Sequence, residues 1–183
     1  MMKGFVFGFV LAVVLLAGGL YYYFASGMAP VAVADPPMPF EKKMAHMALN
    51  AHIAKQSVGE SPVAADETNL LAGAEVYMQH CAGCHGLPDH PAEVATGMYP
   101  RPPQLFKGKG VTDDPASETY WKTVHGIRLT GMPGFKSIIS ETQAWQVSQL
   151  LAHANEITQP VKAVLVPVAP APAAIRARTP PPK

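Results

Sequence analysis

The sequence has 183 residues, of which 49% are hydrophobic, a formal net charge of +1 at pH 7 and only two cysteines. This length allows one ordinary domain, or a smaller domain with additional segments. No stretch has the dense lysine and arginine clustering of a nucleic-acid-binding face, so the charge pattern excludes nucleic acid as the partner.

The first predicted element is an uncharged segment over residues 4–25. Lys3 is the only charged side chain that precedes this segment. As a helix of about 22 residues it is roughly 33 Å long, enough to span the hydrocarbon core of a bilayer. Three consecutive tyrosines near its end suit the headgroup level. We therefore expect residues 1–27 to be a transmembrane anchor. Lys3 favours a cytoplasmic N-terminus, which places the rest of the chain outside the cytoplasmic membrane, in the periplasm.

A cleaved signal peptide is the alternative for the same segment. The apolar region of such peptides is usually about 7–15 residues long and is followed closely by a small-residue cleavage site. The run here is longer, and the small residues at 32–34 come well after it, so we favour a retained anchor. The bulk of the protein is exported on either interpretation.

Residues 28–65 are expected to be a linker that contains one short helix. Proline and small residues are frequent up to Phe40 and again from Ser57, a composition typical of extended spacers. Between them, residues 41–56 contain good helix formers, with methionines and alanines near helical spacing.

Residues 66–157 have the pattern of a folded domain built from helices and loops, with ten acidic and six basic side chains. Helices are predicted over residues 68–81, 115–125 and 140–157. The first has apolar residues at helical spacing that end on Cys81, and in the third Ser140 and Gln143 can form a capping box. Prolines and glycines predict loops over residues 86–115, and no alternating run indicates a strand.

The C-terminal tail, residues 158–183, is rich in proline and alanine, which predicts polyproline-type or disordered structure. It carries four basic side chains and no acidic one. A strap along the acidic surface of neighbouring subunits and a solubilising tail both fit this composition. The sequence VKAVLVPV at residues 161–168 is apolar enough to dock elsewhere on a protein surface.

Both cysteines lie in one short motif, CAGCH, in which Cys81 and Cys84 are followed directly by His85. A structural zinc site needs about four ligands, usually from two Cys/His pairs, and no second cysteine pair exists. A thioredoxin-type dithiol stands at a helix start in a βαβ setting, whereas this pair follows a helix in an all-α context. Covalent haem attachment fits best: the two thiols add to the haem vinyl groups, and the adjacent histidine lies against the iron.

The second axial position of such an iron is predicted to belong to a methionine loop. Met132 stands between Gly131 and Pro133, 47 residues after His85. Histidine and methionine together are the axial pair of cytochromes c, and the small, rigid neighbours favour Met132 over the other methionines. The competing candidates are Met98 and, less strongly, His125, His90 and Met78.

These features together resemble the class I monohaem cytochromes c, here in a membrane-anchored form of bacterial type. The resemblance covers about residues 70–154 and rests on the CAGCH motif, the GMP loop, Gly73, Tyr77, Trp145 and Leu151. It implies an all-α fold in which three short helices surround one covalently bound haem c. The first and last helices are expected to cross at Gly73, with an aromatic residue from each at the contact.

The resemblance also implies a full set of site residues. Cys81 and Cys84 would hold the haem through thioethers, and His85 and Met132 would be the axial ligands of the iron. A proline carbonyl is expected to accept a hydrogen bond from the other ring nitrogen of His85, with Pro102 and Pro103 as the candidates.

We expect an electron carrier and not an enzyme, because both axial positions are filled and substrate has no access to the iron. A tether raises the effective concentration of the haem for membrane partners, which include quinol-oxidising complexes, terminal oxidases and photosynthetic reaction centres. Permanent membership of such a complex is equally consistent with the anchor and the haem domain. If Met132 does not ligate, a five-coordinate haem sensor or peroxide-reactive haem protein is the alternative. An assembly subunit with a structural haem is another.

Overall fold

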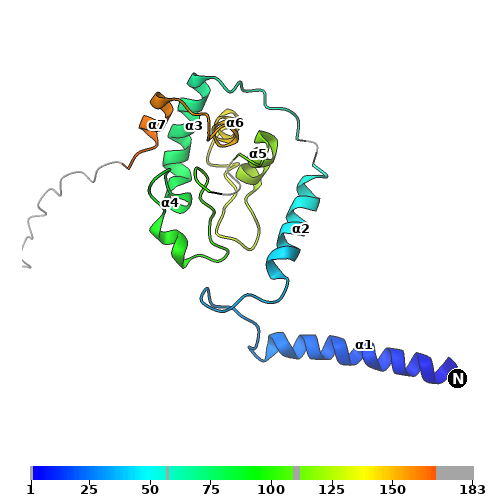
Figure 1. Ribbon diagram of the computed structural model, residues 1–183. Coiled ribbons are helices and arrows are strands. Elements are labelled where there is room, and N and C mark those ends of the chain that lie inside the picture. The colour runs from blue at the N-terminus through cyan, green and yellow to red at the C-terminus, as the bar shows by residue number, and fades with distance from the viewer. Residues whose placement is uncertain (1, 57, 109–111, 168–183) are drawn as a thin grey trace, which may run out of the picture. The chain divides into compact units, whose positions relative to one another are not determined.

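The computed structural model describes residues 2–56, 58–108 and 112–167 of the chain. Within these residues every regular element is a helix (Figure 1), and the one β-type pairing is an isolated bridge between Leu87 and His90. The all-α fold class is therefore confirmed. The chain divides into two compact units, Met1–Lys55 and Gln56–Lys183.

The first unit begins with helix α1, Met2–Ala25, whose 24 residues make it about 36 Å long. Its most apolar window has a mean hydropathy of 2.3 and no buried side chain. In the described part of the chain, α1 is the one helix whose length and composition suit a membrane crossing, a property that signal sequences share. The N-terminal apolar helix is thus compatible with a membrane anchor.

Helix α2, Glu41–Ile53, follows a short turn and occupies most of the segment expected to be helical. The turn is closed by Asp35, whose carboxylate accepts hydrogen bonds from the backbone N–H groups of Ala32 and Val31 at 2.8 and 2.9 Å. These two bonds lower the pKa of Asp35 because they favour the charged carboxylate. The segment between α1 and the second unit thus contains local structure of its own.

The second unit is built on three helices, α3 (Glu67–His80), α5 (Ala116–His125) and α6 (Glu141–Ala152). They correspond to the three predicted helices, although α6 ends earlier than expected. Helices α3 and α6 pack on each other, and α5 packs on α6 (Figure 1). The capping box predicted for α6 is present, because Ser140 Oγ accepts from the N–H of Gln143 while Gln143 Oε1 accepts from the N–H of Ser140.

Helices α3 and α6 cross where α3 has Gly73. A side-chain carbon built on Gly73 would lie 2.3 Å from the carbonyl oxygen of Gln146 and 3.2 Å from Cβ of Leu150. A larger residue therefore fits only if the two helices separate, and the predicted crossing at Gly73 is confirmed. Beside the crossing, Nε2 of Gln146 donates to Oδ1 of Asn69 at 3.1 Å, which links the two helices a turn further along.

The aromatic residues of α3 and α6 each pack on a third element. Tyr77 of α3 is fully buried, and its ring makes an edge contact with Phe106 at a centroid distance of 4.9 Å. Trp145 of α6 stacks on Tyr120 of α5 at 4.0 Å. Tyr77 thus ties α3 to the loop before α5, while Trp145 ties α6 to α5.

Helix α7, Gln159–Val164, lies in the segment expected to be the C-terminal tail. It packs against α3, and the exposed fractions of Val161 and Leu165 are 0% and 3%. Both side chains belong to the same hydrophobic core as Tyr77. The apolar start of the tail therefore docks on the folded unit. The rest of the predicted tail, residues 168–183, lies outside the described residues.

Candidate haem-binding site

The cysteines and the histidine of the CAGCH motif lie on one helical turn directly after α3. Cys81 is the C-cap residue of α3, and α4, Ala82–His85, forms the next turn. The N–H groups of Cys84 and His85 both donate to the carbonyl oxygen of Cys81, at 3.1 and 2.9 Å. Both cysteines are free thiols and half-buried. One turn of backbone thus presents two thiols and one imidazole together.

The ring of His85 is oriented by the carbonyl oxygen of Pro103. His85 Nδ1 lies 2.9 Å from this oxygen, and because a carbonyl can only accept, Nδ1 carries the proton. Nε2 is then the unprotonated nitrogen that can coordinate a metal ion. Burial lowers the pKa of His85, against the opposing effect of the bond to Pro103, so the ring is neutral at physiological pH. Pro103 is one of the two prolines expected to make this contact.

Gly86 and Tyr77 fix the backbone that follows His85. Gly86 has a φ of 77°, a conformation that favours glycine, and a side-chain carbon there would lie 2.7 Å from the carbonyl oxygen of His90. The hydroxyl of Tyr77 donates to the carbonyl oxygen of Gly86 at 2.7 Å. Because Tyr77 is fully buried, this bond joins the core to the turn that carries His85. The sequence indicated Tyr77 only as a packing residue.

Met132 lies on a loop whose backbone is bonded to the end of α5. The N–H of Ile127 donates to the carbonyl oxygen of Met132 at 3.2 Å, and the N–H of Met132 donates to Oγ1 of Thr130 at 3.1 Å. Further along, the N–H of Phe135 donates to the carbonyl oxygen of Thr123 at 2.9 Å. Hydrogen bonds therefore close the loop on both sides of Met132, whose side chain is half-buried.

Two glycines let this loop approach α5 closely. Gly126 ends α5 with a φ of 69°, and a side-chain carbon on it would lie 2.5 Å from the amide nitrogen of Gly134 and 2.8 Å from the carbonyl oxygen of Met132. A side-chain carbon on Gly134 would lie 2.8 Å from the carbonyl oxygen of His125. All three neighbours are backbone atoms, which cannot rotate away. The sequence indicated Gly126 only as the end of the helix, and its contact with Gly134 has no sequence signal of its own.

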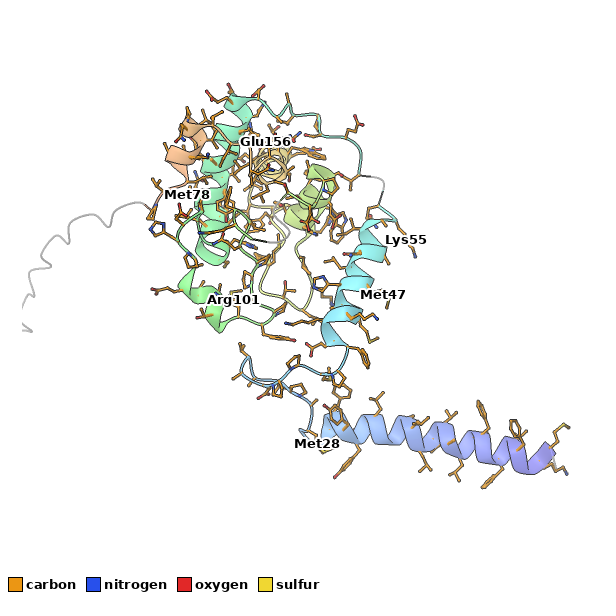
Figure 2. The ribbon with its side chains drawn as sticks, viewed as in Figure 1. Met28, Met47, Lys55, Met78, Arg101 and Glu156 are labelled. Carbon is orange, nitrogen blue, oxygen red and sulfur yellow. The ribbon has the colours of Figure 1, made fainter. Side chains whose placement is uncertain are left out.

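The other candidate axial ligands have different surroundings. Met98 is half-buried, and its side chain reaches the loop that carries Met132. Met78 lies on α3 and packs against the hydrophobic core (Figure 2). His125 and His90 are exposed. Ligation of the iron by Met132 stays a prediction.

The donor set on the CAGCH turn fits covalent haem better than a simple metal ion. In the described ranges, no three His, Cys, Asp or Glu side chains gather into a group that could hold one. Burial, together with the nearby Cys84, raises the pKa of Cys81 to about 12, so its thiol is protonated at neutral pH. Reactive dithiols use the thiolate. Two half-buried thiols beside one oriented, neutral imidazole match thioether attachment and axial ligation.

Residues 68–151 match the family model described as cytochrome C oxidase, cbb3-type, subunit III. No curated protein and no solved structure matches the chain. The matched segment runs from the first turn of α3 to the last turn of α6, so it contains the CAGCH turn, Pro103 and the Met132 loop. Residues 68–151 are therefore a monohaem cytochrome c domain, the electron-carrier class whose one haem c is covalently attached.

Proposed function

We propose that this chain is a membrane-tethered c-type cytochrome that passes single electrons between membrane redox complexes on the periplasmic side. Cys81 and Cys84 are the thioether attachment points, and His85 and Met132 are the axial ligands. The observation that carries this assignment is the 2.9 Å contact between His85 Nδ1 and the carbonyl oxygen of Pro103, on the turn that holds the two thiols. It leaves Nε2 of an oriented, neutral imidazole for the iron.

The residues of the chain set the chemistry of this site. Bound haem c supplies a one-electron couple between ferrous and ferric iron. Pro103 fixes the ring plane of His85 and increases its basicity. The loop bonded to α5 presents the thioether of Met132, a ligand that favours ferrous iron and raises the reduction potential. With protein side chains at both axial positions, substrate cannot reach the iron, and the chain carries electrons without being a catalyst in its own right.

The N-terminal helix supports a role beside other membrane proteins. Residues 26–66 separate α1 from α3, so a domain held by α1 stays near the bilayer and meets membrane partners at a raised effective concentration. The family model describes a subunit of a cytochrome c oxidase, which favours a respiratory setting. A quinol-oxidising complex is then the donor and a terminal oxidase the acceptor, or the chain is itself a subunit of such an oxidase. In a photosynthetic cell, a reaction centre is the corresponding acceptor.

The test follows the redox state of the full-length protein in the membranes of the cells that make it. Quinol is added without oxygen, the haem c absorption is recorded, and oxygen is then admitted. We expect reduction followed by reoxidation at rates within the ordinary range of turnover, on the order of 1–10³ s⁻¹. Membranes from cells that lack this chain are the control. In these membranes the absorption change that is due to the haem of this chain must be absent.

Two results would contradict the proposal. A haem that quinol and oxygen leave unchanged on this timescale indicates an assembly subunit with a structural haem. Ferrous wild-type protein that binds carbon monoxide readily has an open axial position, as a gas sensor or a peroxide-reactive haem protein does.

A further inference from the structure

The side chain of Met98 occupies the space next to Gly131, the residue that directly precedes Met132. A side-chain carbon built on Gly131 would lie 2.1 Å from Cε of Met98 and 3.8 Å from its Sδ. Met98 follows the short helix η1, Glu93–Gly97, and its N–H donates to the carbonyl oxygen of Ala95 at 3.4 Å. The methyl group of Met98 thus stands where residue 131 would otherwise place a side chain.

The segment that begins at Met98 also reaches His85. Five residues further along, Pro103 accepts the hydrogen bond from the His85 ring at 2.9 Å, and the neighbouring Gln104 donates through Nε2 to the carbonyl oxygen of Leu87 at 3.3 Å. Residues 98–104 therefore contact both the turn that follows α3 and the loop that follows α5. Met98, at one end of this segment, contacts the Met132 loop. Pro103, near the other end, is hydrogen-bonded to His85.

The tip of the Met132 loop has little packing to hold it. Leu129 at the tip is 91% exposed, and its φ of 60° is a left-handed backbone conformation that is unfavourable for a residue with a side chain. A loop with a strained, solvent-exposed tip depends on the contacts that its other residues make. The contact of Met98 with Gly131 is one of these.

We propose that Met98 is a positioning residue: its side chain packs on Gly131 and holds the loop in the conformation that keeps Met132 on the iron. This inference rests on the proposed ligation by Met132. Met98 acts through its shape and not through its sulfur, so leucine, which has a similar volume, can replace it. Alanine cannot, because it withdraws the methyl group from Gly131.

The experiment uses the full-length protein with its haem attached, in detergent, and compares Met98→Ala with Met98→Leu. Two quantities report on the bond between methionine and iron. One is the weak far-red absorption band of ferric iron bound to a thioether, followed with temperature, and the other is the carbon monoxide affinity of the ferrous form. In Met98→Ala the band is expected to disappear at a lower temperature. The affinity should rise roughly tenfold, the factor that corresponds to 1.4 kcal/mol of lost stabilisation. Met98→Leu should resemble wild type.

A second variant pair tests the contact itself. Gly131→Ala adds a carbon where the Met98 methyl now lies and should displace that side chain, with an effect like that of Met98→Ala. In the double variant, the added carbon at position 131 occupies the space that the Met98 methyl group has left. The combined effect on the band and on the carbon monoxide affinity should therefore be smaller than the sum of the two separate effects. Additive effects would contradict the contact, because independent sites add.

The outcomes separate this inference from the proposed function. If Met98→Ala leaves the band and the affinity at wild-type values while Met132→Ala opens the iron to carbon monoxide, the positioning role is wrong and the proposed ligation stands. If Met98→Leu abolishes the band as completely as Met132→Ala is expected to, Met98 is itself the ligand. In that case both the positioning role and the ligation by Met132 are wrong.

Discussion

Gly73→Ala is expected to destabilise the cytochrome domain by about 3 kcal/mol, near the upper end of the usual penalty for overpacking a core. The added carbon would lie 2.3 Å from the carbonyl oxygen and 2.7 Å from the carbonyl carbon of Gln146. These are atoms of the α6 backbone, so the clash is relieved only if α3 and α6 move apart. The sign of the change in the free energy of unfolding is diagnostic of the helix contact, because replacing glycine by alanine in an exposed helix normally stabilises a protein by about 1 kcal/mol.

The matched control for this change is Gly97→Ala. Gly97 is exposed, and within the described part of the chain no atom lies within 4 Å of an added side-chain carbon. Its substitution should therefore alter the free energy of unfolding by less than about 0.5 kcal/mol. Chemical unfolding of the full-length protein, followed by haem absorption, measures both variants. A Gly73→Ala protein as stable as Gly97→Ala would show that α3 and α6 do not cross at this residue.

Gly126→Ala is expected to detach Met132 from the iron while the haem stays covalently attached. The added carbon would lie 2.6 Å from the carbonyl carbon of Pro133 and 2.8 Å from the carbonyl oxygen of Met132. Because these are backbone atoms of the loop that carries the ligand, the loop must move. The ferric far-red band should disappear, the ferrous protein should bind carbon monoxide, and the reduction potential should fall, since methionine ligation raises it.

Gly108→Ala separates this effect from simple backbone strain. Gly108 also has a positive φ, 100°, but no atom of the described residues lies within 4 Å of an added side-chain carbon. Both variants therefore pay a conformational penalty for a side chain at positive φ, on the order of 1–3 kcal/mol, and only Gly126→Ala displaces the Met132 loop. If the two variants have the same far-red band and the same carbon monoxide affinity, the contact between Gly126 and the loop does not support the ligand.

The sequence was sufficient for features that depend on local pattern. Helical periodicity located α3, the capping box at Ser140 located the start of α6, and the spacing of CAGCH identified the haem attachment. In each case the information lies within about one helix of sequence, where periodicity and capping act. The crossing at Gly73 was expected only because the family resemblance implies it.

Features that depend on distant contacts were not predictable in the same way. The choice between Pro102 and Pro103 depends on which carbonyl faces His85, 18 residues away. Helix α7 has six residues and includes Pro160, so it has too few turns for a periodic signal, and its burial against α3 arises only in the folded chain. The packing of Gly126 on Gly134 likewise depends on the path of the loop between them.

The most direct test of the whole account is the optical spectrum of the full-length protein in membranes. It is recorded oxidised, reduced, and reduced with carbon monoxide, for wild type and for Met132→Ala. The account predicts a covalently held, low-spin haem that ignores carbon monoxide in wild type and binds it in the variant. A wild-type haem that already binds carbon monoxide, or a variant that still excludes it, would contradict ligation by His85 and Met132.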